Sequence, residues 1–177
     1  MSDLYGKVTD DQDILRKLMS KIPGFGGYIE RGNRRDADKL LRESIAEKYE
    51  QVWKKVGNIQ KDLASQQELE YIDDLDGATT KMRTFIDKVR GASYGYSGFF
   101  DAVKIKQDAL KRLYEYDLTL VDWAETLSAA ADKVEAAIGT EEIEAPVKEL
   151  VDLSRELVSA FEKRDEVITA QESTESQ

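Results

Sequence analysis

Asp117 is the residue of this sequence whose surroundings most favour unusual acid–base chemistry. It is the one polar member of an otherwise apolar row at helical spacing: Leu110, Leu113, Asp117, Leu120, Ala124, Leu127, Ala131, Val134 and Ile138. Since such a row is normally buried, its carboxylate must be paired or protonated. A catalytic acid also needs a partner and a cleft, and the sequence indicates neither. We therefore predict a structural Asp117, paired with an arginine such as Arg83 or Arg90.

The residue types that the sequence lacks exclude several classes of enzyme. The chain has 177 residues and contains no Cys and no His. This rules out disulfides, Cys/His zinc sites, thiol nucleophiles and His-based proton relays. The acidic clusters at residues 73–76 and 141–144 lack the Glu-x-x-His pattern of di-iron bundles, and the phosphate-loop and dinucleotide-binding patterns do not occur. We predict no catalytic residue, no metal site and no cofactor, so the protein is not expected to be an enzyme.

A basic run formed by Arg31, Arg34 and Arg35 lies at the start of a predicted helix. Positive charge is unfavourable beside a helix N-terminus. An anion can resolve this conflict, whether it is a phosphate, a lipid headgroup, a nucleic acid or an acidic partner. Pairing with Asp36, Asp38 and other acids of this acidic chain can also resolve it. The sequence leaves both interpretations open.

Two glycine–aromatic segments have no helical pattern of their own. Residues 22–28 read IPGFGGY, and residues 94–102 read YGYSGFFDA. Their aromatic residues are Phe25, Tyr28, Tyr94, Tyr96, Phe99 and Phe100. Rigid aromatic side chains are favoured at binding hot spots. Wide turns between helices also need glycine, and aromatic rings can close the open end of a bundle. A binding surface and a structural plug therefore remain alternatives.

Five segments of the sequence have helical patterning. They cover about residues 9–22, 34–64, 66–90, 107–138 and 146–168. Thr9 and Gln12 can form a capping box, Asn33 is a good N-cap, and Ser65 with Glu68 can form a second box. Residues in steps of three and four then follow, largely as heptads. The rows are Leu41, Ile45, Tyr49, Val52, Val56, Ile59 and Leu63 in the second segment; Ile72, Leu75, Thr79, Met82, Ile86 and Val89 in the third; and Val147, Leu150, Ser154, Leu157 and Phe161, with Ile168 further on, in the fifth. The first helix is expected to be short and residues 1–8 loose.

Glycine and proline mark the remaining helix boundaries. Gly91 is expected to end the third helix and Gly139 the fourth. Pro146 suits the first position of the fifth helix, where its missing N–H costs nothing. Residues 92–106 therefore form the longest connection of the predicted fold.

The stripes predict the fold class. Each long helix has one apolar stripe and must bury it against its neighbours. The fold expected is all-α, an antiparallel up-down bundle of four long helices plus a short N-terminal helix. One domain would cover residues 1–170, with a disordered polar tail at residues 171–177. The up-down order places both glycine–aromatic turns at one end, beside the arginines, and leaves a plain acidic opposite end.

The charge of the chain bears on its partners and location. The net charge of -10 repels nucleic acid and anionic lipid as a whole. The first residues lack the order of a signal peptide, and no apolar run approaches the ~18–20 residues of a membrane span. We expect a cytoplasmic protein that does not bind nucleic acid. Membrane association is expected only peripherally, through the arginine-bearing end.

The two glycine–aromatic segments also carry a resemblance. With IPGFGGY and YGYSGFFDA, the chain resembles a set of small all-helical prokaryotic proteins of unassigned function, over roughly residues 21–120. The resemblance implies a soluble, all-helical protein. It implies no activity.

Taken together, these patterns predict a non-enzymatic interaction or scaffold module that binds a protein partner. The expected binding residues are Phe25, Tyr28, Arg31, Arg34, Arg35, Tyr94, Tyr96, Phe99 and Phe100. The alternative is a helical bundle that binds a small apolar or anionic ligand, or a lipid surface, at the same end. A homo-oligomer is also compatible with the heptads, because a stripe does not reveal whether its partner lies in the same chain.

Overall fold

A computed structural model describes the backbone of residues 2–92 and 107–169. Its elements are α1 (Ser2–Lys21), α2 (Phe25–Glu30), α3 (Arg34–Ser65), the 3₁₀ turn η1 (Leu69–Tyr71), α4 (Ile72–Gly91), α6 (Gln107–Ala137), α7 (Glu144–Arg155) and α8 (Leu157–Thr169). Every element in these two ranges is helical, which confirms the expected all-α class.

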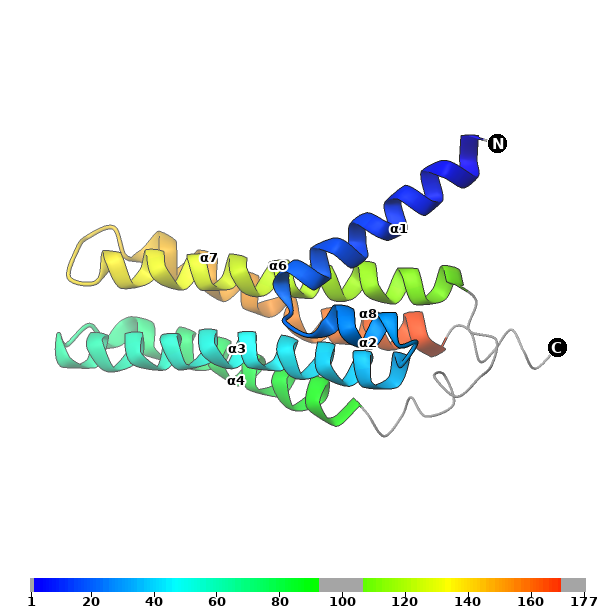
Figure 1. Ribbon diagram of the computed structural model, residues 1–177. Helices are drawn as coiled ribbons and strands as arrows, with labels where there is room; N and C mark the ends of the chain where they lie inside the picture. Colours follow the sequence, from blue (N-terminus) through cyan, green and yellow to red (C-terminus); the bar gives the residue numbers. More distant parts are fainter. Residues whose placement is uncertain (1, 93–106, 170–177) are drawn as a thin grey trace.

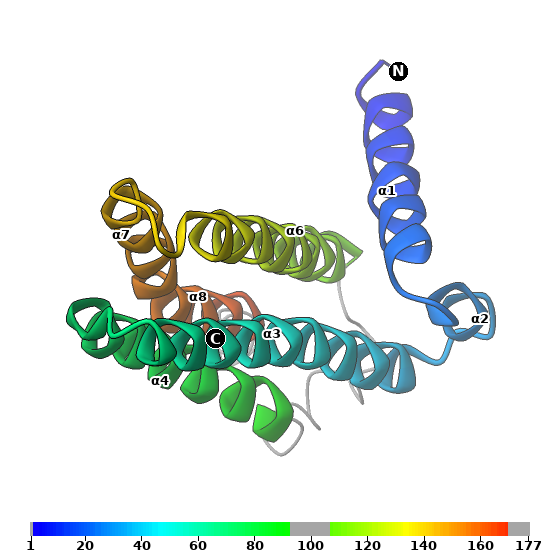
Figure 2. The same ribbon diagram turned by 90° about the vertical axis from the view of Figure 1, so that its left-hand side faces the viewer.

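The long helices pack lengthwise around one core. Helix α3 contacts α4 and α6, while α7 and α8 each contact both α4 and α6. Figures 1 and 2 show α1 leaving this body at an angle, and its contacts are with α6 and α2. No helix in the described part of the chain is long and apolar enough to cross a membrane.

Helix α3 matches the prediction at both ends and along its stripe. The side chain of Asn33 accepts a hydrogen bond from the backbone N–H of Asp36 at 3.2 Å, so Asn33 is the N-cap that the sequence predicts. The helix ends at Ser65, within one residue of the expected position. The whole predicted stripe is buried: Leu41, Ile45, Tyr49, Val52, Val56, Ile59 and Leu63.

The N-terminal region is more helical than the sequence predicts. Helix α1 begins at Ser2 instead of Thr9 and is 20 residues long, so it is neither short nor preceded by a loose segment. Residues 2–8 contain one glycine and no proline, and nothing in them stops a helix. The first glycine–aromatic turn contains a short helix of its own, α2. Gly24, with φ 85°, lets the chain turn sharply into it.

The connection between α3 and α4 corrects a predicted helix start. Ser65 and Glu68 form no capping box, since Ser65 belongs to α3 and its hydroxyl donates back to the carbonyl of Asp62 at 2.7 Å. Such a local bond competes with the capping geometry. The chain then turns through Gln67, with φ 64°, and α4 begins only at Ile72.

The later boundaries are partly as expected. Helix α4 ends at Gly91, and Gly139 follows the end of α6 with φ 78°. The predicted fifth helix is two helices, because Glu156 separates α7 from α8. Helix α7 begins at Glu144, which places Pro146 at its third position instead of its first.

Replacing Gly139 with alanine should destabilise the fold, whereas the same change at Gly57 should not. We expect Gly139→Ala to lower the free energy of unfolding by about 1–2 kcal/mol, since L-residues avoid this left-handed conformation. Its added Cβ would also lie 2.9 Å from Oε1 of Gln66. Gly57, in the middle of α3, is the matched control, because a Cβ there meets no described atom within 4 Å. Gly57→Ala should raise stability by up to about 1 kcal/mol. Urea unfolding measures both, and a Gly139→Ala protein as stable as wild type would contradict the expectation.

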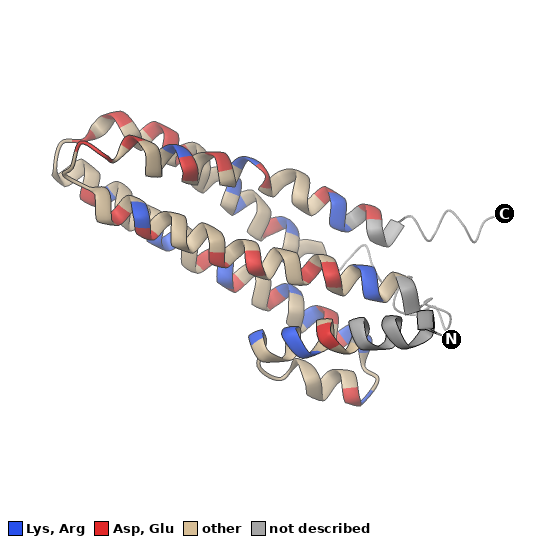
Figure 3. Ribbon diagram, turned by 90° about the horizontal axis from the view of Figure 1, so that it is seen from above, with Lys and Arg blue, Asp and Glu red and all other residues tan. Residues whose placement is uncertain are grey.

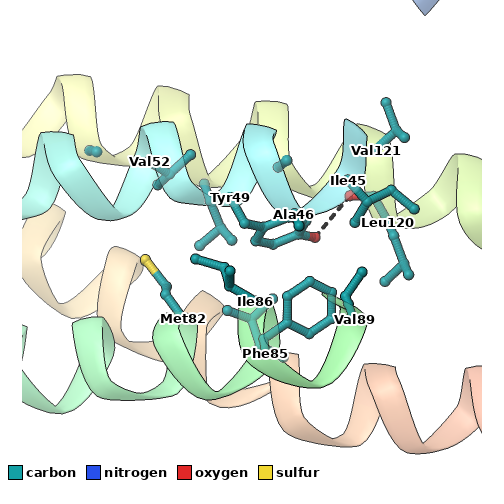
Figure 4. Close-up of a cluster of buried hydrophobic side chains, with 14 of the residues drawn as sticks. Ile45, Ala46, Tyr49, Val52, Met82, Phe85, Ile86, Val89, Leu120 and Val121 are labelled. Atoms are coloured by element: carbon teal, nitrogen blue, oxygen red, sulfur yellow. Dashed lines mark hydrogen bonds between the residues drawn. The ribbon is translucent and has the colours of Figure 1, made fainter. Parts of the chain in front are cut away.

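The centre of the core joins α3, α4 and α6 (Figure 4). Its labelled residues are Ile45, Ala46, Tyr49, Val52, Met82, Phe85, Ile86, Val89, Leu120 and Val121. The Tyr49 hydroxyl donates to the backbone carbonyl of Leu120 at 2.8 Å, and burial raises the pKa of Tyr49. The ring centroid of Phe85 lies 4.4 Å from that of Tyr49 and 6.4 Å from that of Phe161 on α8. Aromatic contacts thus connect three helices at this point.

Candidate functional site

Four charged side chains in the described part of the chain are buried together. Asp38 and Arg42 come from α3, Asp117 from α6 and Arg164 from α8. Asp117 and Arg164 are fully buried, and the other two are at most 5% exposed. Burial of an unpaired charge is very costly, so such a group must be internally compensated.

The geometry provides this compensation. The guanidinium group of Arg164 forms a bidentate ion pair with Asp117: Nε donates to Oδ1 at 2.7 Å and Nη2 donates to Oδ2 at 3.0 Å. Its Nη2 also donates to Oδ1 of Asp38 at 2.9 Å. Arg42 donates from Nε to Oδ2 of Asp38 at 2.7 Å and from Nη1 to the carbonyl of Val89 at 3.4 Å. We call these two carboxylates and two guanidinium groups the buried charge network; it connects α3, α4, α6 and α8.

The prediction for Asp117 is correct in its burial and pairing but wrong in its partner. Arg83 and Arg90 lie on the surface of α4 and pair with Asp87 and Glu50, respectively. Arg164 reaches Asp117 because α8 packs against α6. The predicted stripe of the last helix steps directly from Phe161 to residue 168, and the position it omits, three residues after Phe161, is Arg164.

The arrangement is suited to holding helices together and not to acid–base catalysis. All four carboxylate oxygens of Asp38 and Asp117 accept a hydrogen bond from a guanidinium group, so none is left to act as a base. Burial raises the pKa of Asp117, and the charge and hydrogen bonds of Arg164 oppose that rise. Within the described ranges, no group of three or more acidic side chains is placed to hold a metal ion.

Tyr114 lies near the buried charge network and packs against α2. Its side chain is 4% exposed, and its ring meets the ring of Phe25 edge-on at 5.6 Å. Burial raises the pKa of Tyr114, and the charges of Asp38 and Asp117 raise it further. The hydroxyl therefore stays protonated, and it has no hydrogen-bond partner among the residues that the structure describes.

The predicted binding residues fall into four groups. Phe25 is buried in the core. Tyr28 is half-buried, and the guanidinium carbon of Arg31 lies over its ring, 5.0 Å from the ring centroid, in a cation–π contact. The three arginines are exposed at the junction of α2 and α3: Arg31, Arg34 and Arg35. Four of the predicted residues lie outside the described ranges: Tyr94, Tyr96, Phe99 and Phe100. Partner binding by these residues stays a prediction.

The three exposed arginines define what we call the arginine end. Of the two acids named as neutralising partners, Asp38 is held by Arg42 and Arg164, and Asp36 accepts a hydrogen bond from the side-chain amide of Asn33. In Figure 1 the start of α3, the end of α4 and the start of α6 lie on the same side of the molecule. The second glycine–aromatic turn itself, residues 93–106, lies outside the described ranges.

Comparison with models of protein families, with curated proteins and with solved structures finds no significant match to this chain. The resemblance drawn from the motifs IPGFGGY and YGYSGFFDA therefore stays a prediction.

Proposed function

We propose that this protein is a non-enzymatic interaction module that binds an acidic protein partner through its arginine end. The observation that carries the proposal is the exposure of Arg31, Arg34 and Arg35 together on a chain whose net charge is -10. Arginine is favoured in interfaces because its planar fork binds carboxylates with two hydrogen bonds. The three residues provide several such forks within five residues of the chain, Arg31 at the end of α2 and Arg34 and Arg35 at the start of α3.

The proposal includes an antiparallel up-down arrangement of α3, α4, α6 and the α7–α8 pair, with α1 and α2 added on one side. The lengthwise packing of these helices supports it. In such a bundle each helix buries one face against its neighbours and keeps its opposite face at the surface. A cytoplasmic location, as expected from the sequence, belongs to the same proposal.

The buried charge network supports a binding role over an enzymatic one. The carboxylates of Asp38 and Asp117 are hydrogen-bonded to Arg42 and Arg164. These buried acids therefore hold the helices together. The arginine end also favours a partner surface over an enclosed ligand. Arg31 lies over Tyr28 at the surface, and Arg35 is exposed.

A charge reversal tests the proposal. We expect the variant Arg31→Glu/Arg34→Glu to bind the partner at least roughly tenfold more weakly, because like charges then face each other across the interface. The partner is first captured from an extract of the source cells, then purified and titrated with each protein by calorimetry. Circular dichroism should show unchanged helicity, since both side chains are exposed.

The matched control is Lys54→Glu/Lys61→Glu, which changes the net charge by the same amount at two positions within α3. Both lysines are exposed and lie farther along α3. This control should retain the partner. Equal loss with both variants would show a general charge effect, and equal retention would contradict binding at the arginine end. Binding of anionic vesicles by wild type, lost only in the arginine variant, would favour a lipid surface instead.

A further inference from the structure

The end of the molecule opposite the arginine end has its own defined structure. There, the connection between α3 and α4 meets the connection between α6 and α7 (Figure 1). The backbone N–H of Gly139 donates to Oε1 of Glu68 at 3.0 Å, and an added Cβ on Gly139 would contact Gln66. The two connections therefore lie against each other and form one face.

This face, which we call the acidic end, comprises residues 66–71 and 139–146. It holds Glu68, Glu70, Glu141, Glu142 and Glu144; these two stretches contain no lysine or arginine, and Lys148 lies two residues beyond the second. Figure 3 shows acidic residues in the connection between α6 and α7. A side-chain hydrogen bond with Glu70 raises the pKa of Tyr71, and burial and the charges of Glu70, Glu144 and Glu68 raise it further.

The acidic end is also hollowed and partly apolar. An open hollow of about 630 Å³ is lined by Glu141, Glu142, Glu144, Ala145, Pro146 and Lys148. Leu69, in η1 on the same face, is 62% exposed, more than any other large hydrophobic side chain in the described part of the chain. An apolar side chain ringed by charge is typical of an interaction surface.

The two ends of one molecule therefore carry complementary surfaces. One presents arginines from the α2–α3 junction, with the half-buried ring of Tyr28 beside Arg31. The other presents glutamates from both connections, together with the exposed Leu69. Neither end suits a symmetric contact with the same end of another copy, because like charges would face each other.

We propose that a second copy of this chain binds head to tail, with the arginine end of one molecule on the acidic end of the next. This contact is heterologous, and it continues as a filament or closes as a ring according to the rotation between copies. The inference rests on the proposed function, since it names the acidic partner of the arginine end as the chain itself.

The overall charge of -10 does not prevent this contact at physiological salt. Helix α3 alone, with 32 residues, is about 48 Å long. Charges along the body of one copy thus lie many times the screening length of about 8 Å from most of the next copy. The arginines and glutamates at the contact would lie within that length of each other, so salt screens their attraction less than it screens the repulsion between the bodies of the two copies.

Sedimentation velocity with two single-end variants tests the inference. Arg31→Glu/Arg34→Glu reverses the arginine end, and Glu141→Lys/Glu142→Lys reverses the acidic end; all four side chains are exposed. In about 0.15 M salt, wild type should sediment faster as its concentration rises. Each variant alone should bind itself at least roughly tenfold more weakly. An equal mixture should assemble again, because the variant with two acidic ends can alternate with the variant with two basic ends.

Two further proteins complete the test. A chain with both reversals should assemble again, since its ends are complementary with opposite polarity, and Lys54→Glu/Lys61→Glu should assemble like wild type. The inference is overturned if wild type stays monomeric at every concentration, or if either single-end variant assembles as well as wild type. Failure of the proposed function looks different. A monomeric wild type whose arginine end still binds an acidic partner from the cell keeps that function and removes only the self-association.

Discussion

Replacing Arg164 with methionine is expected to lower the free energy of unfolding by about 3–5 kcal/mol. Methionine fills much of the aliphatic volume of arginine but provides no charge. The fully buried carboxylate of Asp117 then loses both hydrogen bonds that Arg164 donates to it, whereas Asp38 keeps Arg42. Urea unfolding followed by circular dichroism measures the effect, and an unchanged m-value would show that the compactness of both states is preserved.

Two controls separate the buried network from charge removal in general. Asp117→Leu/Arg164→Met removes one acid and one base, which leaves Asp38 paired with Arg42, and it should recover most of the loss. Arg83→Met breaks an ion pair with Asp87 in which both side chains are about half exposed, and it should cost about 0–1 kcal/mol. If Arg164→Met costs no more than Arg83→Met, the network does not stabilise the fold as argued.

The same variant should show a pH dependence of known sign. Burial raises the pKa of Asp117 above its ordinary value of 3.8, so the folded state binds a proton there more tightly than the unfolded state. The stability gained from this proton is complete below the unfolded pKa and is lost as the pH rises through the folded pKa. Without Arg164 the folded pKa rises further. The difference in stability between Arg164→Met and wild type should therefore become smaller as the pH is lowered from 7 towards about 4.

The fold class could be predicted because the signals that specify it are local. The stripe of α3 from Leu41 to Leu63 has an uninterrupted helical period, and Asn33 is followed at the right distance by an acidic residue. The stripe of α6 and its end near Gly139 are equally regular. In each case, spacing along the chain determines the buried face without knowledge of the neighbours.

The arrangement of side chains between helices could not be predicted in the same way. The spacing predicts a buried row of Ile72, Leu75, Thr79, Met82, Ile86 and Val89 in α4. Ile72 and Thr79 are only half-buried, and Ala78 and Phe85 are buried as well. Helix α4 contacts α3 on one side and both α7 and α8 on another, so it needs a wider apolar face than a single stripe. Sequence spacing does not show how many neighbours a helix has.

The candidate site has the same limit. Asp117 could be recognised because it interrupts an apolar row. Arg164 also lies at a buried position of the last helix, but a charged residue there is normally interpreted as exposed. A buried arginine and a buried aspartate on different helices are each unfavourable alone, and only their contact makes both acceptable. The prediction could name the need for an arginine, whereas the choice of Arg164 depends on the packing of α8 against α6.

Replacing Phe85 with alanine is the second change for which we expect a large effect, a loss of about 3–5 kcal/mol in the free energy of unfolding. Phe85 is fully buried and lies between Tyr49 of α3 and Phe161 of α8. Three separate helices border the space that its ring fills. Collapse into a cavity there requires all three to move, so little of the lost packing can be regained. Urea unfolding measures the loss.

Phe85→Leu is the matched control, since it keeps an apolar side chain of similar reach and should cost less than half as much. A double-mutant cycle with Phe161→Ala isolates the edge-on contact with α8, for which we expect a coupling of about 0.5–1.5 kcal/mol. If the two losses simply add, α8 is held by the buried charge network and by its other apolar residues, and Phe85 matters only to α3 and α4. A clear coupling would show that α8 is bound to the bundle at two places, through Arg164 to α3 and α6 and through Phe161 to α4. Two attachment points fix both the register and the tilt of the last helix, which neither could do alone.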